Sequence, residues 1–229
     1  MMLGKCQKYT MVLFSVLFMC FPGLLLHAQT VKHVVVIDPA HGGEDAGVVG
    51  IDKIAEKDLT LAIAQALKKE LAQNANLEVV LTRDSDKTVS LAERRKNIRK
   101  IQPAIVLSLH INAGFGKTSS GFEMYYPGFH EENDSPKKKT GKDDANDEKY
   151  LSDTVRLSRL VQKGLDGLFP RKGRGLREAD VPLAEDLALP VLTVELGFAT
   201  NPEEKKKLAS GRTQKDIARA LAKSINSFF

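Results

Sequence analysis

Two histidines stand where strands are predicted to end, the position at which α/β proteins commonly bind ligands. His41 follows a short β-branched run, and His110 closes a second apolar run. Because ligands collect at the carboxyl ends of strands in open α/β sheets, the two imidazoles could converge on one point. A single histidine at a strand end more often has a structural role. Here, however, glycines flank both (Gly42-Gly43 and Gly114), and glycine lets a ligand approach the backbone closely.

The third ligand is expected to be a carboxylate, because both cysteines, Cys6 and Cys20, lie in the N-terminal leader described below. Glu56 is the candidate, since it begins the helix predicted after the His41 loop. An acid at a helix N-terminus is also favoured by the helix dipole, and from spacing alone that simpler role is the commoner one. His41, Glu56 and His110 would form a His₂Glu set with an open fourth position, the arrangement of a catalytic zinc. The chain has no HExxH motif, which excludes thermolysin-type chemistry.

Hydrolysis at such a metal also needs a proton acceptor, and Glu195 is the candidate. It lies near the carboxyl end of the apolar run 190–197, where a carboxylate without a partner is costly to bury. A partner or a function is therefore expected. The two interpretations are a general base and a structural salt bridge to an arginine elsewhere in the chain.

The elements that must position these residues alternate between strands and helices. Strands are predicted at 33–38, 77–82, 104–110, 122–126 and 190–197. Helices are predicted at 56–73, after the Ser90 capping box to 101, around 155–168, after Asn201-Pro202 and at 213–229. This order predicts a single α/β domain, with a mostly parallel central sheet covered by helices on both faces.

Residues 1–28 have the parts of a secretory signal peptide. Lys5 and Lys8 precede an apolar run from Met11 to Leu26, and a small residue stands before the expected cut. The alternative is an uncleaved membrane anchor. The run is shorter than the roughly 20 residues needed to span a bilayer, and Pro22-Gly23 interrupts it. We therefore expect cleavage, a catalytic domain over 29–229, and a periplasmic or secreted protein with no stable membrane span.

The charge and the aromatic content of the chain indicate which kinds of molecule it could bind. Loss of the leader would lower the formal net charge from +5 to +3 and leave no cysteine, so the remaining chain would depend on its core rather than on disulfides. Aromatic residues make up 6% and Trp is absent, which speaks against a stacking platform for single-stranded nucleic acid. No nucleic-acid partner is expected. A mildly basic surface would suit an anionic polymer such as a cell wall.

One segment differs from the rest of the chain. Residues 128–150 interleave acids and lysines and contain few apolar side chains. Such a segment buries too little apolar surface to order itself, so we expect a flexible surface insertion.

Five short motifs occur in order from about Val34 to the C-terminus. They are VIDPAHGG at 36–43, EKDL at 56–59, LTRD at 81–84, SLHINA at 108–113 and VELGFATNP at 194–202. In combination they resemble the zinc-dependent N-acetylmuramoyl-L-alanine amidases of the Amidase_3 family, which are bacterial cell-wall enzymes. One departure is Ala40, where the family usually has Gly; a methyl group there leaves the ligands intact.

The resemblance implies zinc ligands at His41, Glu56 and His110, with Glu195 as the catalytic glutamate. It implies hydrolysis of the amide between N-acetylmuramic acid and the L-alanine of the stem peptide, for cell-wall remodelling or daughter-cell separation. Peptidoglycan is then the partner, and we expect a monomer. Some relatives carry a helix near the insertion that blocks the zinc until an activator protein displaces it. Residues 128–150 have no apolar face to dock, so no such helix is expected here, while an activator stays open.

Two other classes stay open at this point. One is a non-catalytic wall-binding or regulatory protein on the same scaffold, which a zinc assay separates from the enzyme. The other is a zinc peptidase that cleaves within the stem peptide, which analysis of the digestion products separates.

Overall fold

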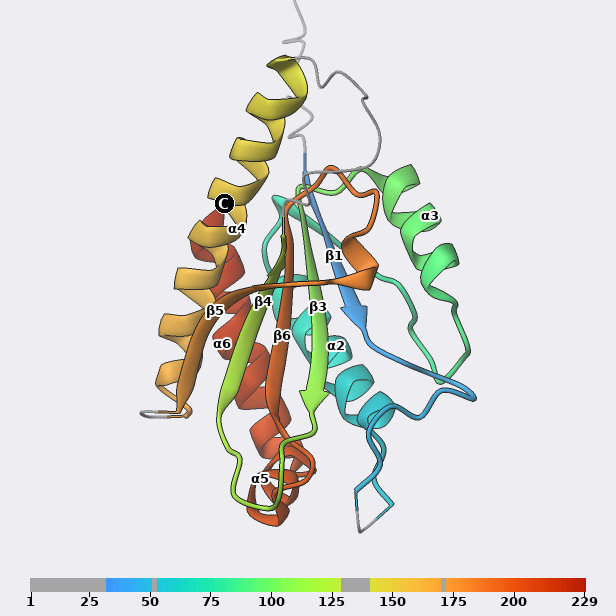
Figure 1. Ribbon diagram of the computed structural model, residues 1–229, viewed down its shortest axis with the longest axis vertical. Coiled ribbons are helices and arrows are strands. Elements are labelled where there is room, and N and C mark those ends of the chain that lie inside the picture. The colour runs from blue at the N-terminus through green and yellow to red at the C-terminus, as the bar shows by residue number, and fades with distance from the viewer. Residues whose placement is uncertain (1–31, 51–52, 129–140, 170–171) are drawn as a thin grey trace, which may run out of the picture. The chain divides into compact units, whose positions relative to one another are not determined.

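The structure is a computed structural model that describes residues 32–50, 53–128, 141–169 and 172–229. Its six strands form one sheet in the order β2-β1-β3-β6-β4-β5 (Figure 1). The strands are β1 (His33–Pro39), β2 (Leu77–Leu81), β3 (Ile105–Asn112), β4 (Phe122–Pro127), β5 (Gly173–Ala179) and β6 (Val191–Phe198). β2, β1, β3 and β6 run parallel to one another, whereas β4 pairs antiparallel with β6 and parallel with β5. The expected mostly parallel sheet is confirmed.

Helices cover both faces of this sheet, as the sequence predicts. The larger core lies between the sheet and α2 (Glu56–Leu71), α4 (Gly141–Asp166) and α6 (Gly211–Phe228). The smaller core lies on the other face, under α3 (Leu91–Ile101) and the 3-10 helix η1 (Pro182–Ala184). A short helix, α5 (Pro202–Leu208), follows β6, and the Asn201 side chain caps it by accepting from two backbone amides.

Side chains along each strand alternate between the two cores, and this alternation selects the face on which chemistry can occur. In β3, Leu107 and Leu109 pack in the larger core, whereas Val106 packs in the smaller one. Ser108 and then His110, at the carboxyl end of β3, lie on the same face of the sheet as Val106. β6 repeats the pattern with Val191, Thr193 and Glu195. The α3 face therefore changes from apolar to polar toward the carboxyl ends of the strands.

The structure differs from the sequence-based expectations in two places. α4 begins at Gly141, so the expectation of a flexible insertion over 128–150 is wrong for 141–150, which is helical. Residues 129–140 lie outside the described residues, so the expectation that no helix blocks the site stays a prediction. β5 and η1 were not expected, because β5 is a polar strand that contains two glycines.

Residues 32–229 form one compact unit. The predicted leader, residues 1–28, lies outside the described residues. Within the described ranges, every helix is too short or too polar to cross a bilayer.

Candidate metal centre and catalytic site

Two buried arginines hold the loop that carries His41. Arg83 Nη2 donates to the carbonyl oxygen of Ala40 at 2.9 Å. Arg94 Nη1 donates to the carbonyl oxygen of Pro39 at 2.9 Å, and its Nη2 donates to that of His41. His41 itself has φ of 61°, a left-handed conformation that is unfavourable for a residue with a Cβ atom. These hydrogen bonds sustain that conformation, so side chains distant in sequence fix the direction of the imidazole.

An acid on β1 in turn neutralises one of these arginines. Asp38 Oδ1 lies 2.7 Å from Arg94 Nη1, and both side chains are almost fully buried. Asp38 Oδ2 also accepts a hydrogen bond from Ser108 Oγ on β3 at 2.9 Å. The polar face of the sheet therefore begins with a buried, fully partnered ion pair beneath the His41 loop.

Glu56 begins α2, and its carboxylate points to the carboxyl end of the sheet. The residue is 2% exposed. Its Oε2 accepts from the backbone amide of Val48 at 3.0 Å, and its Oε1 accepts from that of Ile111 at 2.9 Å. Glu56 is therefore more than an acid at a helix N-terminus, because two backbone amides fix its carboxylate between the β1–α2 loop and β3.

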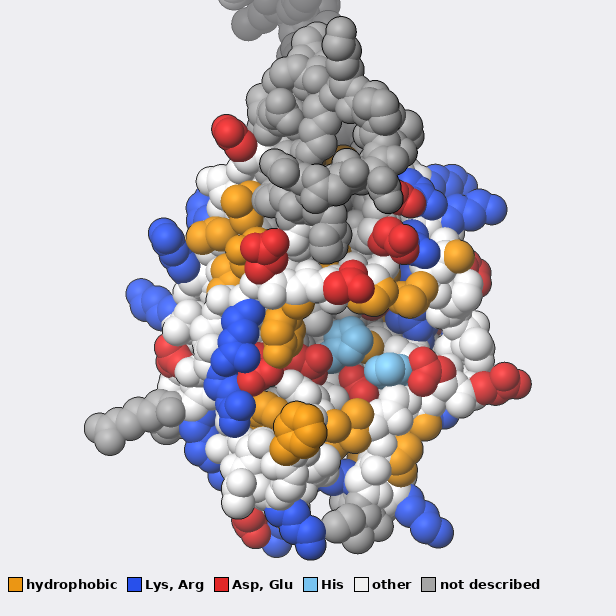
Figure 2. Space-filling model, viewed as in Figure 1, with side chains coloured by type: hydrophobic (Ala, Val, Ile, Leu, Met, Phe, Trp, Pro, Cys, Tyr) orange, Lys and Arg blue, Asp and Glu red, His pale blue; other side chains and the backbone are white. Residues whose placement is uncertain are grey.

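The structure brings the three predicted ligands together. His41 Nε2 lies 3.1 Å from Glu56 Oε2, and His110 Nδ1 lies 3.3 Å from Glu56 Oε1. The three candidate ligand atoms all lie within 4.8 Å of one another. The two imidazoles are 26% and 31% exposed, so the set is open to solvent on one side. Figure 2 shows histidine side chains at the surface among acidic side chains.

Charge coupling within this set is strong. The hydrogen bond to Glu56 raises the pKa of His41 to about 9, against the opposing effect of burial. Burial raises the pKa of Glu56, but hydrogen bonds from the two imidazoles and two backbone amides outweigh it and lower that pKa well below its usual range. An anionic carboxylate between two imidazoles is a set of ligands that could hold a cation.

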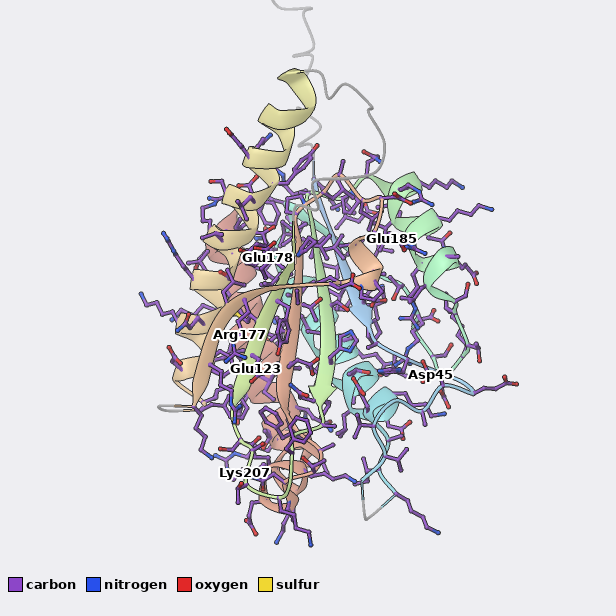
Figure 3. All side chains as sticks on the ribbon, in the orientation of Figure 1. Asp45, Glu123, Arg177, Glu178, Glu185 and Lys207 are labelled. Carbon is purple, nitrogen blue, oxygen red and sulfur yellow. The ribbon has the colours of Figure 1, made fainter. Side chains whose placement is uncertain are left out.

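Two further residues support the set, and sequence reasoning did not name them. Asp45 Oδ2 lies 2.8 Å from His41 Nδ1, which leaves Nε2 directed toward Glu56 (Figure 3 labels Asp45). In many proteins, a metal-binding histidine is oriented by a hydrogen bond from its other ring nitrogen to a carboxylate. A Cβ atom on Gly47 would lie 2.6 Å from both Glu56 Oε2 and His41 Cδ2. The spacing in the sequence, with Asp45 four residues after His41 and Gly47 two residues further, could have indicated both residues.

Glu195 lies beside His110 in register, on the same face of the sheet. Its Oε2 is buried and has no hydrogen-bond partner among the described residues. Burial raises the pKa of Glu195 to about 7, and the neighbouring histidines only partly oppose the effect. Within the described part of the chain, no arginine forms a salt bridge with Glu195, so the salt-bridge interpretation is not supported. A carboxyl that titrates near neutral pH next to a cation site has the properties of a general base.

A pocket of about 550 Å³ opens at the same end of the sheet. Loops that follow β1, β3 and β6 line it, among them Val48, Gly114 and Thr200. The Val48 amide also donates a hydrogen bond to Glu56, so the pocket adjoins the candidate metal centre. Loops of the carboxyl edge thus form both the site and a concave surface beside it.

Comparison with known proteins agrees with this arrangement. The sequence profile of the Amidase_3 family, described as N-acetylmuramoyl-L-alanine amidase, matches residues 35–227. The chain is 33% identical to N-acetylmuramoyl-L-alanine amidase CwlM of Bacillus licheniformis, over 85% of this chain and 68% of the relative. Among solved structures, it is similar to amidase AmiC2 of Nostoc punctiforme, with 30% identity and a TM-score of 0.68 over 87% of this chain and 98% of that one.

A second structural match is the CwlD amidase of Clostridioides difficile, solved in complex with the GerS lipoprotein. It shows 25% identity and a TM-score of 0.69 over 86% of this chain and 98% of that one. Family profile, sequence relatives and solved structures therefore agree along nearly the whole described fold. The chain belongs to the Amidase_3 family of N-acetylmuramoyl-L-alanine amidases, which act on peptidoglycan.

Proposed function

We propose that His41, Glu56 and His110 hold Zn²⁺ and that Glu195 is the catalytic base of a peptidoglycan amidase. The donor set supports zinc: two imidazoles and one carboxylate is a common set of protein ligands for a catalytic zinc, which keeps a further position for water or substrate. The carboxylate is anionic, and the side of the set that faces solvent provides access.

The reaction is hydrolysis of the amide that joins the lactyl group of N-acetylmuramic acid to the L-alanine of the stem peptide. Zinc, when bound, polarises the scissile carbonyl and makes the attacking water more acidic. Glu195 accepts the proton of that water and then delivers it to the departing amine. Its Oε2 is buried and has no hydrogen-bond partner among the described residues, so this oxygen can accept a proton.

Three further side chains, Asp45, Arg83 and Arg94, hold His41 and its loop in place. Asp45 accepts from Nδ1 of His41 and so keeps Nε2 as the ligand atom. Arg83 and Arg94 hold the backbone of the His41 loop. The proposal places the mature enzyme in the periplasm or outside the cell, after cleavage of the leader, where it remodels the wall or separates daughter cells.

The observation that carries this proposal is a buried carboxyl oxygen of Glu195 that has no partner among the described residues and stands in register with His110, a member of the candidate ligand set that faces solvent. The test is digestion of purified peptidoglycan sacculi by the zinc-loaded protein, followed by mass spectrometry of the products. We expect stem peptides with a free L-alanine amine and intact glycan strands. Cleavage within the stem peptide would instead identify a peptidase.

Two variants separate metal binding from chemistry. Glu195→Ala should keep one zinc per chain and lose hydrolysis by several orders of magnitude, whereas His41→Ala should lose both. Zinc content by plasma mass spectrometry and the digestion assay are measured on the same preparations. A Glu195→Ala protein that still digests sacculi would remove the proposed mechanism, and a wild-type protein that binds no zinc would favour a non-catalytic wall-binding role.

An activator protein is part of the proposal only by analogy with CwlD, whose structure includes GerS. The same digestion assay tests it. We expect measurable hydrolysis by the purified chain alone, and stimulation on addition of the extracellular protein fraction would indicate a partner.

A further inference from the structure

A row of charged side chains crosses the α3 face of the sheet and extends beyond Glu195. His110 on β3 is in register with Glu195 on β6, and Glu195 is in register with Glu123 on β4. Neighbouring strands lie about 5 Å apart, so each member of this row is one such step from the next. Glu123 is 5% exposed and lies on the side of Glu195 away from the metal centre.

Glu123 is held in place by three donors. Asn112 Nδ2 and the Tyr125 hydroxyl both donate to Oε2, and Arg174 Nη1 lies 3.2 Å from Oε1. The row therefore ends in an arginine on the edge strand β5.

Arg174 reaches this face because of a β-bulge. Phe122 pairs with Gly173 and Met124 pairs with Leu176, so Arg174 and Gly175 both stand opposite Glu123. Gly175 in this bulge has φ of 81°, a left-handed conformation that glycine adopts without steric cost. Because side chains alternate along a strand, the extra residue moves Arg174 onto the face that also carries Arg177.

Contacts on three sides fix the Arg174 guanidinium. Besides Glu123, its Nε donates to the carbonyl oxygen of Ser120, and its Cζ lies 4.7 Å from the centre of the Phe198 ring. The side chain is nevertheless 39% exposed. A guanidinium with a fixed orientation and an accessible edge is well suited to bind a carboxylate with two hydrogen bonds.

Arg177 adds a second cation on the same face. It stands in register with Tyr125 and is exposed, while alternation directs the next residue, Glu178, to the other face. The two arginines and Glu123 leave a formal charge of +1 beside Glu195. Figure 3 labels Arg177 and Glu123 on neighbouring strands, and Figure 2 shows cationic side chains in a stripe next to the acidic and histidine side chains.

We infer that Arg174, assisted by Arg177, binds a free carboxylate on the second residue of the stem peptide. This inference rests on the proposed amidase function. The second stem residue is a glutamate joined through its side chain, so its main-chain carboxyl is either free or amidated. An extended chain advances about 3.5 Å per residue, which places that carboxyl about 7 Å from the scissile carbonyl. Glu123 stands one strand, about 5 Å, beyond Glu195. Arg174 Nη1 lies 3.2 Å from the Glu123 carboxylate, so the guanidinium lies on the side of Glu195 toward which the stem peptide would extend.

The geometry also orients the substrate. The peptide side of the scissile amide would lie over β4 and β5, and the sugar side would lie toward the loops after β1 and β3. The structure thus assigns Arg174 as a specificity residue that distinguishes a free from an amidated stem.

The test compares two synthetic substrates, N-acetylmuramoyl tripeptides that differ only in a carboxylate or a carboxamide on the second residue. We expect the wild-type protein to favour the carboxylate in kcat/KM by about tenfold to a hundredfold, the range for hydrogen bonds to a charged group. Arg174→Gln should lose that factor on the carboxylate substrate and change less than about twofold on the amide. Arg177→Gln should lose a smaller part, and Arg174→Lys should keep some of the preference.

Arg212→Gln is the matched control, because Arg212 is exposed on α6 and far along the chain from the row. The free tripeptide acid and its amide, used as competitive inhibitors, give a second readout that does not depend on turnover. An equal loss on both substrates by Arg174→Gln would mean that Arg174 only supports Glu123, and would overturn the inference. Equal wild-type rates on both substrates would overturn it as well, with the amidase function intact. Hydrolysis of neither substrate by a protein that also leaves sacculi undigested would overturn the amidase function itself, and the inference with it. If sacculi are digested, equal inhibition by the tripeptide acid and its amide would overturn the inference alone.

Discussion

Replacement of Glu195 by glutamine gives a sharp test of the charge state of the site, through stability rather than activity. Burial raises the pKa of Glu195 from 4.5 to about 7, so the folded state binds this proton more tightly than the unfolded state does. Folding stability contributed by this group is therefore present below pH 4.5 and is lost as the pH rises to about 7. The rise of the pKa from 4.5 to about 7, at about 1.36 kcal/mol for each pH unit, corresponds to roughly 3 kcal/mol of stability.

Glutamine resembles the neutral carboxyl and cannot ionise, so Glu195→Gln should escape this loss. We expect the free energy of unfolding of Glu195→Gln, relative to wild type, to rise by up to about 3 kcal/mol between pH 4.5 and pH 8. Any constant difference between the two proteins reflects the hydrogen bonding of the amide and does not bear on the argument. The measurement is urea unfolding followed by circular dichroism across this pH range, with chelator present, because a nearby divalent cation would favour the carboxylate.

Glu178→Gln is the control, since Glu178 is an exposed carboxylate of the same sheet. The change measured for Glu195→Gln is compared with the change for this control at each pH. The reasoning about burial is refuted when the difference between Glu195→Gln and wild type stays constant, within about 0.5 kcal/mol, from pH 4.5 to pH 8.

Three other predictions concern the support of the metal centre. Asp45→Ala should weaken zinc binding by about tenfold to a hundredfold, because His41 loses the acceptor that orients it, and competition with a chelator of known affinity measures the change. Gly47→Ala should lower zinc occupancy at limiting metal, because the new Cβ would lie 2.6 Å from Glu56 Oε2; an unchanged occupancy would show that the loop moves aside freely. Arg94→Met should destabilise the fold by about 3–5 kcal/mol in urea unfolding, because it leaves Asp38 buried without its cation, and Asp38→Asn in the same background should recover part of the loss.

The sequence predicted the strands other than β5 and indicated that His41 and His110 could converge, with Glu56 as the candidate third ligand. Short β-branched runs mark buried parallel strands, and the carboxyl ends of parallel strands meet at one edge of a sheet, so His41 and His110 were expected on that edge. The structure adds that β1 and β3 are neighbours, which brings the two imidazoles together. The structure adds what fixes Glu56, namely the amides of Val48 and Ile111. Both hydrogen bonds come from backbone amides, which every residue type except proline carries, so the sequence could not indicate them.

The sequence did not predict β5, because GRGLREA lacks the apolar alternation of a half-buried strand. It is an edge strand, and its bulge depends on one glycine among several. The start of α4 was also missed. Leu157, Val161 and Leu165 anchor that helix in the core, and extension of an existing helix through charged residues costs little once the first turn has formed. Composition alone suggested a disordered segment there.

The hydrogen bonds around the ligands have a consequence for how the protein acquires its ion. Each oxygen of Glu56 bonds a backbone amide, and the His41 loop is tied to arginines, so these contacts require no cation. In small zinc-dependent domains the ion is needed for folding itself. If the chain is the proposed zinc enzyme, we expect it to fold in metal-poor surroundings and to bind its ion afterwards. Local metal supply would then set how much of the folded population is active, and depletion would silence the enzyme reversibly without exposing it to proteolysis.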